Sequence, residues 1–239
     1  SKITMKILAL QNCEIEGFGL YEKYFIDLGM EYQIIHAYQN YSFPEADLFD
    51  AIFVGGTPIS AYEAYKYPFL QAEFEYLGQA IGVRKPCFGI CCGAQILALL
   101  LGAQVRKCEL KEIGGYEVRL TKAGQSDPLF KQFPRHFPVF HWHGDTFDVP
   151  PSSELLVEGD DCKNQFFRWN KVVGAQFHLE VTSQDVINWA GEYAQELVEI
   201  GKSKEQVVEE CKIQEQEMEL LAVRLLDNFF KFIVGTQLS

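Results

Sequence analysis

Short apolar runs alternate with helical patterns through the first half of this sequence, and this alternation limits the fold more than any other feature. Four runs have the length and composition of strands, at residues 6–10, 33–36, 51–54 and 86–90. Helical spacing of apolar residues occurs at residues 20–28, 70–81 and 92–101. Strands that alternate with helices form parallel βαβ units. We therefore expect an α/β fold with a mostly parallel sheet and helices on both faces.

The region from about residue 104 to residue 173 has a different pattern. Its candidate strands are separated by Pro, Gly and Asp residues that favour turns, and they lie at residues 116–120, 139–142 and 154–158. Strands joined in this way are more often antiparallel. The sequence therefore predicts a small antiparallel addition to the parallel sheet.

The C-terminal part of the chain is predicted to be helical. Ser203, with Gln206 three residues later, matches the capping box that begins many helices. Four apolar residues predict the buried face of a long helix: Leu221, Leu225, Phe229 and Phe232. Four glutamates are expected on its solvated face: Glu205, Glu209, Glu210 and Glu217. Residues 5–239 are expected to form one domain, and residues 1–4, which precede Met5, are expected to be a cloning remnant.

Charge and composition argue against several classes of function. The 33 Asp and Glu residues against 21 Lys and Arg give a net charge of -12, which disfavours binding to nucleic-acid phosphates. No stretch approaches the ~20 consecutive apolar residues of a membrane span. The N-terminus lacks the long apolar core of a signal peptide. We expect neither a nucleic-acid partner nor a membrane partner.

The seven cysteines are an odd number, are scattered along the chain and form no C-x-x-C motif. This pattern disfavours a secreted disulfide framework, a zinc ribbon and a redox dithiol. The chain also has no G-x-x-x-x-G-K-[ST] phosphate loop. We therefore expect a cytoplasmic protein without metal or cofactor, in which most thiols are buried.

A candidate nucleophile lies where the last of the four early strands meets a helix. Gly89-Ile90-Cys91-Cys92-Gly93 has the G-x-C-x-G form of a nucleophile elbow, with a thiol in place of a hydroxyl. Such a turn forces the nucleophile into a strained backbone conformation, and side chains at 89 and 93 would collide with the neighbouring strand and helix. The sulfur of Cys91 is expected at the carboxyl end of the sheet, where open α/β folds hold their sites.

A candidate base is found among five histidines. His36, on an early strand, and His136, in a Pro-rich loop, are expected to be structural or exposed. His178 follows the apolar run 172–177 and precedes Glu180 by two residues, which places both side chains on one side of an extended chain. Glu180 could then orient the imidazole of His178 while its other nitrogen faces the thiol.

Two glycines after the strand at 51–54 complete the candidate site. The N–H of Gly56, in the run Gly55-Gly56-Thr57, could donate to an oxyanion, and the second donor would be the N–H of Cys92 at the helix start. Losing one such donor typically costs ~10²–10³ in rate. A Gly-Gly pair alone indicates no more than a turn.

The three segments together resemble those of the class I, triad-type, glutamine amidotransferases. The similarity extends over nearly the whole chain, and residues 111–115 resemble a segment of stand-alone chains similar to the glutaminase domain of GMP synthase. The resemblance implies a flavodoxin-like sheet, a Cys-His-Glu triad and a thioester intermediate. It also implies substrate-binding roles for the following residues: Gly55, Gln95, His143, Gly144 and Asp145. The chain departs from the family at Leu179, where Pro is frequent, and at Cys92, where an aromatic or aliphatic residue is usual.

The leading hypothesis is therefore a glutaminase that releases ammonia from glutamine. Because the chain has no room for a synthase domain, either a partner protein supplies the acceptor site or the chain works alone. If it works alone, the alternative is a γ-glutamyl peptidase or hydrolase that uses the same triad on γ-glutamyl conjugates.

Two further hypotheses come from other classes. A metallohydrolase could use His141, His143 and Asp145, but Thr146 stands where a dinuclear site needs another histidine. A silent interaction module would keep the fold without the chemistry. The joint presence of Cys91, His178 and Glu180 argues against it.

Overall fold

The computed structural model describes residues 4–40 and 42–235. The expectation that residues 1–4 are a cloning remnant concerns residues that, apart from Thr4, lie outside these ranges. Among the described residues, no helix combines the length and the apolar character that crossing a membrane requires.

Nine strands form one sheet in the order β2-β1-β3-β4-β9-β8-β7-β5-β6. Five strands pair in parallel with one another: β1 (Lys6–Gln11), β2 (Glu31–His36), β3 (Ala51–Val54), β4 (Cys87–Ile90) and β9 (Val172–Ala175). This part has the 2-1-3-4-5 strand order of flavodoxin-like folds. The predicted α/β class and parallel sheet are confirmed.

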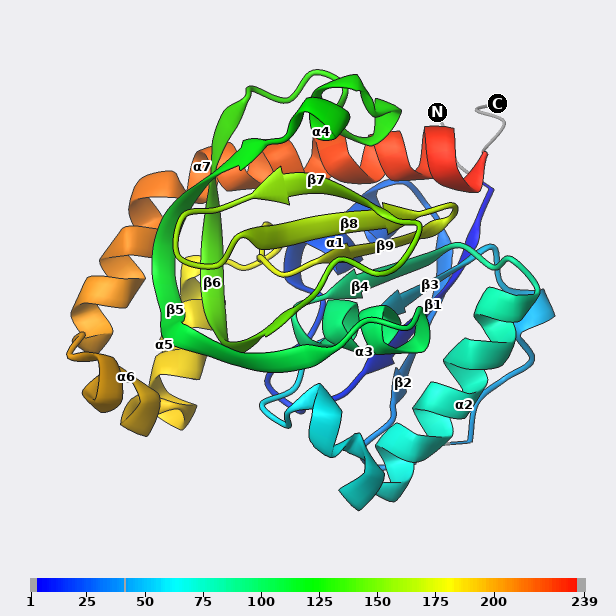
Figure 1. Cartoon of the computed structure of the whole chain (residues 1–239), viewed down its shortest axis with the longest axis horizontal. Coiled ribbons are helices and arrows are strands. Elements are labelled where there is room, and N and C mark those ends of the chain that lie inside the picture. The colour runs from blue at the N-terminus through cyan, green and yellow to red at the C-terminus, as the bar shows by residue number, and fades with distance from the viewer. Residues whose placement is uncertain (1–3, 41, 236–239) are drawn as a thin grey trace.

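Antiparallel strands continue the same sheet beyond β9 (Figure 1). They are β5 (Val105–Leu120), β6 (His136–Phe147), β7 (Glu154–Glu158) and β8 (Asn164–Trp169). This part is larger than the three short strands indicated by the sequence, since β5 and β6 are long and β8 was not predicted. The prediction of a loop at His136 was wrong, because this exposed residue begins β6.

Helices cover both faces of the sheet, as predicted (Figure 1). One hydrophobic core joins the sheet to α1 (Gly19–Asp27), α5 (Ser183–Glu192), α6 (Ala194–Ile200) and α7 (Lys204–Asn228). The other joins it to α2 (Pro68–Gly82) and α3 (Cys92–Leu100). The shorter helical segments are η1 (Ala46–Leu48), η2 (Ala61–Lys66), α4 (Lys122–Ser126), η3 (Pro128–Phe130) and η4 (Phe229–Val234). Neither α5 nor α6 was predicted as an element.

The C-terminal helix differs from its prediction in three details. Ser203 caps α7 by accepting a bond from the Gln206 N–H at 3.0 Å, but the reciprocal bond of a capping box is not formed. The helix continues as a π-helix from Phe229, and this change of period leaves Phe232 half-buried while Phe230 is buried. Glu210 is half-buried, because its carboxylate accepts a bond from the Gly115 N–H at 3.1 Å.

Candidate active site

Cys91 occupies a strained turn between β4 and α3. Its φ of 54° and ψ of -113° lie where residues with side chains are rare. The turn needs its two glycines. A Cβ on Gly89 would stand 2.6 Å from the Gly93 carbonyl oxygen, and a Cβ on Gly93 would overlap the Val54 carbonyl. The collisions predicted from the sequence are therefore present.

His178 and Glu180 form a buried pair beyond the end of β9. Nδ1 of His178 lies 2.8 and 2.9 Å from the two carboxylate oxygens of Glu180, and the residues are 4 % and 2 % exposed. Two backbone hydrogen bonds to Phe140 on β6 hold the His178 backbone. The Trp189 ring packs edge-on against the imidazole, with the two ring centroids 5.0 Å apart. The imidazole is thus fixed from three sides.

The sheet brings the cysteine and the histidine together. β4 and β9 are parallel neighbours, and the Cys91 N–H donates to the carbonyl of Ala175, the last residue of β9, at 2.7 Å. Nε2 of His178 has no hydrogen-bond partner among the described residues. Burial opposes a positive charge on His178, but Glu180 and Cys91 raise the pKa of its imidazole well above the usual range. The second imidazole nitrogen is therefore available to the thiol.

The two residues expected to form the oxyanion hole lie beside the nucleophile. A Cβ on Gly56 would stand 3.6 Å from the Cys91 Cβ, so this backbone passes close to the nucleophile. Neither the Gly56 N–H nor the Cys92 N–H donates a hydrogen bond to another group in the described part of the chain. The Cys92 side chain turns away and donates to the Ile59 carbonyl at 3.3 Å.

Gly55 holds a structural place in the same turn. Its N–H donates to the Leu10 carbonyl at 2.9 Å, and its own carbonyl accepts a bond from Asn12 at 3.0 Å. The same Asn12 amide donates to Glu73, a fully buried residue of α2, at 2.9 Å. The structure thus places Gly55 behind the pocket described next, and not in its lining.

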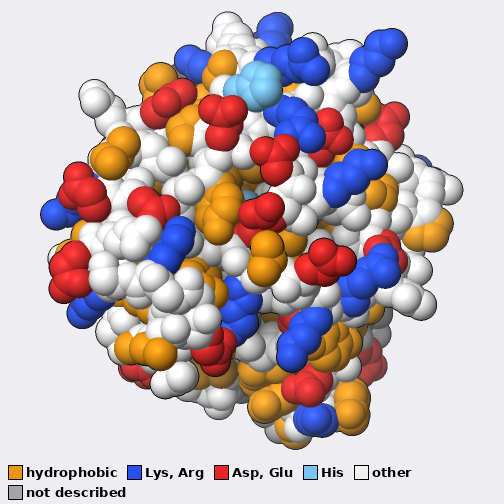
Figure 2. Space-filling model, turned by 60° about the vertical axis from the view of Figure 1, so that its left-hand side comes forward, with side chains coloured by type: hydrophobic (Ala, Val, Ile, Leu, Met, Phe, Trp, Pro, Cys, Tyr) orange, Lys and Arg blue, Asp and Glu red, His pale blue; other side chains and the backbone are white. Residues whose placement is uncertain are grey.

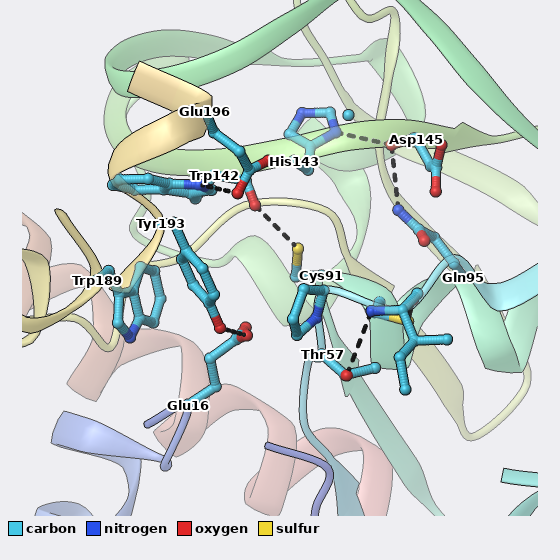
Figure 3. Close-up of a pocket in the computed structure, with 14 residues that line it drawn as sticks. Glu16, Thr57, Cys91, Gln95, Trp142, His143, Asp145, Trp189, Tyr193 and Glu196 are labelled. Atoms are coloured by element: carbon cyan, nitrogen blue, oxygen red, sulfur yellow. Dashed lines mark hydrogen bonds between the residues drawn. The ribbon is translucent and has the colours of Figure 1, made fainter. Parts of the chain in front are cut away.

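A pocket opens over the nucleophile (Figure 3). Six of its residues were named from the sequence as site residues: Cys91, Cys92, Gln95, His143, Gly144 and Asp145. The other lining residues are Glu16, Thr57, Pro58, Ile59, Trp142, Trp189, Tyr193 and Glu196. Tyr193 donates to Glu16 at 2.6 Å, and the Trp142 indole donates to Glu196 at 3.1 Å, so two carboxylates are held at the pocket wall.

Gln95 and His143 are linked through the loop that was expected to bind substrate. The Gln95 amide donates to the Asp145 carbonyl at 3.1 Å and to the Gln176 side chain at 3.0 Å. Nδ1 of His143 lies 2.7 Å from the same Asp145 carbonyl. The Gln176 amide, in turn, donates to the Cys91 sulfur at 3.6 Å. These bonds position the loop against the nucleophile.

The ligand set of the metallohydrolase hypothesis is not assembled. Nε2 of His141 and of His143 lie 3.4 and 2.8 Å from one Glu112 oxygen, whereas the Asp145 carboxylate accepts from Tyr62. Burial opposes the charge on Glu112, but the two histidines bring its pKa down to about 2. Among the described residues, two groups have the spacing of metal ligands, and neither includes Asp145. They are Glu112 with His141 and His143, and His143 with Cys108 and Cys162.

Comparison with known proteins agrees with this geometry. The family described as Glutamine amidotransferase class-I matches residues 14–186, which include the elbow and His178 with Glu180. The chain belongs to this family. Membership of this family implies a cysteine-dependent amide hydrolase.

Individual relatives extend the comparison. The glutamine amidotransferase-like protein YfeJ of Salmonella typhimurium is 32% identical over 200 residues, which cover 82% of this chain and 84% of that protein. One subunit of the glutamine-hydrolysing GMP synthase of Methanocaldococcus jannaschii is 31% identical over 112 residues, or 46% of this chain and 58% of that subunit. The crystal structure of a glutamine amidotransferase from Thermotoga maritima superposes with a TM-score of 0.88 at 30% identity, covering 94% of this chain and 97% of that one.

The sequence contained little signal for the residues that were missed. Trp189, Tyr193 and Glu196 lie on or beside α5 and α6, in a stretch without a motif. The helical spacing of Val186, Trp189 and Ala190, all buried, could have revealed α5, although not its position over the pocket.

Proposed function

We propose that this chain hydrolyses the γ-amide of glutamine through a thioester on Cys91 and releases ammonia. The observation that supports this proposal most strongly is the strained Cys91 beside a buried His178 whose outer nitrogen is unpaired among the described residues and whose inner nitrogen is bound to Glu180. This is the nucleophile, base and orienting group that covalent amide cleavage needs.

In the first half of the reaction, His178 takes the proton of the Cys91 thiol, the sulfur attacks the γ-carbonyl carbon and the carbonyl electron pair moves to oxygen. The N–H groups of Gly56 and Cys92 stabilise that oxyanion. As the intermediate collapses, the C–N bond breaks and His178 transfers a proton to the departing nitrogen, which leaves as ammonia.

In the second half, water attacks the thioester while His178 accepts its proton. The C–S bond then breaks, His178 returns the proton to the departing sulfur, and glutamate leaves. Glu180 keeps its hydrogen bond to Nδ1 of His178 and stabilises the imidazolium that forms twice in each cycle.

The pocket offers groups for the rest of a glutamine molecule. We assign Gln95, His143, Gly144 and Asp145 to substrate binding, as the sequence indicated. The held carboxylates of Glu16 and Glu196 add acceptors suited to the α-ammonium group of the substrate.

The ammonia acceptor is assigned to a separate synthase protein, by analogy with the matched GMP synthase subunit. A cytoplasmic location suits this role, because all seven cysteines are free thiols. Under this proposal the purified chain has weak glutaminase activity, which a cognate synthase would raise by completing the oxyanion hole.

A second candidate, a γ-glutamyl peptidase or hydrolase, is favoured by the aromatic part of the pocket. The rings of Trp142, Trp189 and Tyr193 lie beside one another at the pocket wall and could pack on a leaving group larger than ammonia (Figure 3). Nothing in glutamine itself requires three aromatic rings.

The two candidates are separated by kcat/KM for glutamine and for a γ-glutamyl dipeptide, measured by glutamate release. We expect glutamine to be the better substrate. A dipeptide that reacts more than about tenfold better would replace the first candidate with the second. Cys91→Ala should abolish both reactions; activity that survives in this variant would contradict both candidates.

A further inference from the structure

Two cysteines that the proposed mechanism does not use lie together on the far side of His143. Cys108 lies in the irregular part of β5, where pairing with β6 shifts between Lys107 and Glu112. Cys162 lies in the turn between β7 and β8. The two sulfur atoms are 3.2 Å apart, with the Cys162 thiol donating to the Cys108 sulfur.

The surroundings favour a negative charge on one sulfur of this pair. Nδ1 of His143 lies 3.8 Å from the Cys108 sulfur. The hydrogen bond from Cys162 and, against the effect of burial, the contact with His143 lower the pKa of Cys108 to about 6. The hydrogen bond to Cys108 and burial raise the pKa of the Cys162 thiol. The pair therefore favours a thiolate on Cys108 and a thiol on Cys162.

Cys108, Cys162 and His143 together have the spacing of a soft-metal site, but both imidazole nitrogens of His143 already have hydrogen-bond partners. Nδ1 of His143 lies 2.7 Å from the Asp145 carbonyl, and Nε2 lies 2.8 Å from Glu112. Both nitrogens therefore act as donors, and His143 has no lone pair to offer as a third ligand. The arrangement suits a reactive dithiol better than a zinc site.

We propose that Cys108 and Cys162 form an oxidative modification site, which a hydroperoxide converts to a disulfide. The Cys108 thiolate attacks the peroxide, the O–O bond breaks, and the departing alkoxide or hydroxide takes a proton from solvent, so that Cys108 becomes a sulfenic acid. The Cys162 sulfur then attacks that sulfur, its proton joins the departing hydroxide as water, and the S–S bond forms. The two thiols have lost two electrons to the peroxide, and a dithiol reductant reverses the reaction.

Exposure fits this order of events. Cys108 is half-buried and can be reached by a small peroxide, whereas Cys162 is 6 % exposed and is placed to resolve the sulfenic acid. Disulfide formation removes the negative charge beside His143, a residue of the substrate pocket that is linked through the Asp145 carbonyl to Gln95. The cysteine pair therefore reaches the pocket through His143, whose Nδ1 lies 3.8 Å from the Cys108 sulfur.

The test uses the full chain with Cys91→Ala, so that oxidation of the nucleophile does not intervene. Reduced protein receives limiting hydrogen peroxide at neutral pH, is blocked with an alkylating reagent and is mapped by mass spectrometry. We expect a linked peptide pair containing Cys108 and Cys162, with a mass lower by two hydrogen atoms, that dithiothreitol separates.

Single variants test the assigned roles. With Cys162→Ser, Cys108 should stop at a sulfenic acid that dimedone labels; with Cys108→Ser, Cys162 should react several-fold more slowly than Cys108 does. Cys211→Ser, which removes a buried thiol elsewhere, serves as the matched control and should form the Cys108–Cys162 link at the parental rate.

Three results would overturn the proposal. One is that Cys108 and Cys162 stay free while other cysteines are oxidised. Another is that Cys108 links to a different cysteine. The third is that the purified chain holds one zinc ion per molecule, lost in Cys108→Ser, which protects both thiols from peroxide.

Discussion

Cys91 keeps a φ of 54° although it carries a side chain, and its neighbours explain how the chain maintains this conformation. Its N–H is bound to Ala175, and the backbones of β3 and α3 close around the flanking glycines. The cost of such a conformation is about 1–3 kcal/mol, which the surrounding packing must offset. The position of the nucleophile therefore depends on atoms outside the motif that contains it.

Gly89→Ala tests this dependence. The new Cβ would lie 2.6 Å from a backbone oxygen of α3, so we expect a loss of about 2–4 kcal/mol in the free energy of unfolding, measured by urea denaturation. Gly78→Ala in α2 is the control, because its Cβ would meet only a leucine methyl at 3.7 Å and alanine favours a helix. Equal stability of the two variants would contradict the crowded turn.

Glu180→Gln and Cys91→Ala separate orientation from covalent chemistry. The amide introduced by Glu180→Gln would keep an acceptor near His178 but lose the charge that stabilises imidazolium, so kcat should fall by about 10²–10⁴. Cys91→Ala should reduce the rate to background. Glu192→Gln, on the exposed side of α5, is the charge control and should behave as wild type. Identical residual rates for the first two variants, both above background, would exclude a triad.

Glu73 gives the stability of the chain a dependence on pH. Burial raises the pKa of this carboxyl to about 8, against the opposing effect of its bond from Asn12. The unfolded chain releases this proton near its ordinary pKa of 4.5, whereas the folded chain keeps it until about pH 8. The stabilising contribution of the protonated group is therefore complete below pH 4.5 and declines as pH rises toward 8.

Glu73→Gln removes this titration. The unfolding free energy of the variant minus that of wild type should increase by about 1–3 kcal/mol as pH rises from 5 to 8. Urea denaturation at several pH values measures this difference. Glu75→Gln, on the exposed side of α2, is the control and should follow wild type. A constant difference between Glu73→Gln and wild type at all pH values would count against a buried neutral acid.

At the scale of elements, α5 links helix capping to the site. Thr182 and Asp185 form a full capping box at its start, and Trp189 on its buried face packs against His178. A helix of this length derives much of its stability from such ends and from packing. The position of the His178 imidazole should therefore respond to a change at the cap.

Thr182→Ala should lower the unfolding free energy by about 1 kcal/mol, because it leaves the Asp185 N–H without its acceptor. Thermal and urea unfolding measure this loss. Ser183→Ala at the next position keeps the cap and should cost little, since the bond recorded for Ser183 uses its backbone N–H. An equal loss in both variants would show that the cap is not the cause.

At the scale of the whole molecule, the net charge of -12 is spread over a mixed surface. Figure 2 shows acidic and basic side chains interspersed on one face, with separate hydrophobic side chains between them. Exposed ion pairs such as Lys23 with Asp27 contribute little in water. Repulsion among the excess carboxylates should therefore outweigh them.

Added salt tests this balance. Raising KCl from about 0.02 M to about 0.5 M screens long-range repulsion, and we expect the Tm to rise by about 2–4 °C, which corresponds to ~1 kcal/mol for a chain of this size. Differential scanning calorimetry provides the measurement, and an uncharged osmolyte at matched osmolality provides the control. A fall in Tm with salt would mean that the ion pairs outweigh the repulsion.

The sequence by itself determined the parallel part of the fold, the elbow at Cys91 and the pairing of His178 with Glu180. The alternation of apolar runs and helical patterns is local information, and the elbow glycines and the spacing of His178 and Glu180 lie within a few residues of the groups they constrain. Each of these features depends on the backbone conformation of residues that are close together in the sequence. The sequence could therefore be interpreted without knowledge of distant contacts.

Only the tertiary structure decided which residues far apart in the chain meet. Strand β8, the meeting of Trp142 from β6 with Trp189 from α5 at the pocket, and the place of Gly55 behind the pocket all depend on long-range packing. The absence of a C-x-x-C motif argued against a redox dithiol, yet Cys108 and Cys162 meet because two separate hairpins bring them within 3.2 Å. Contacts of this kind depend on how strands from distant parts of the chain pair and in which register. Short-range sequence patterns do not specify that pairing.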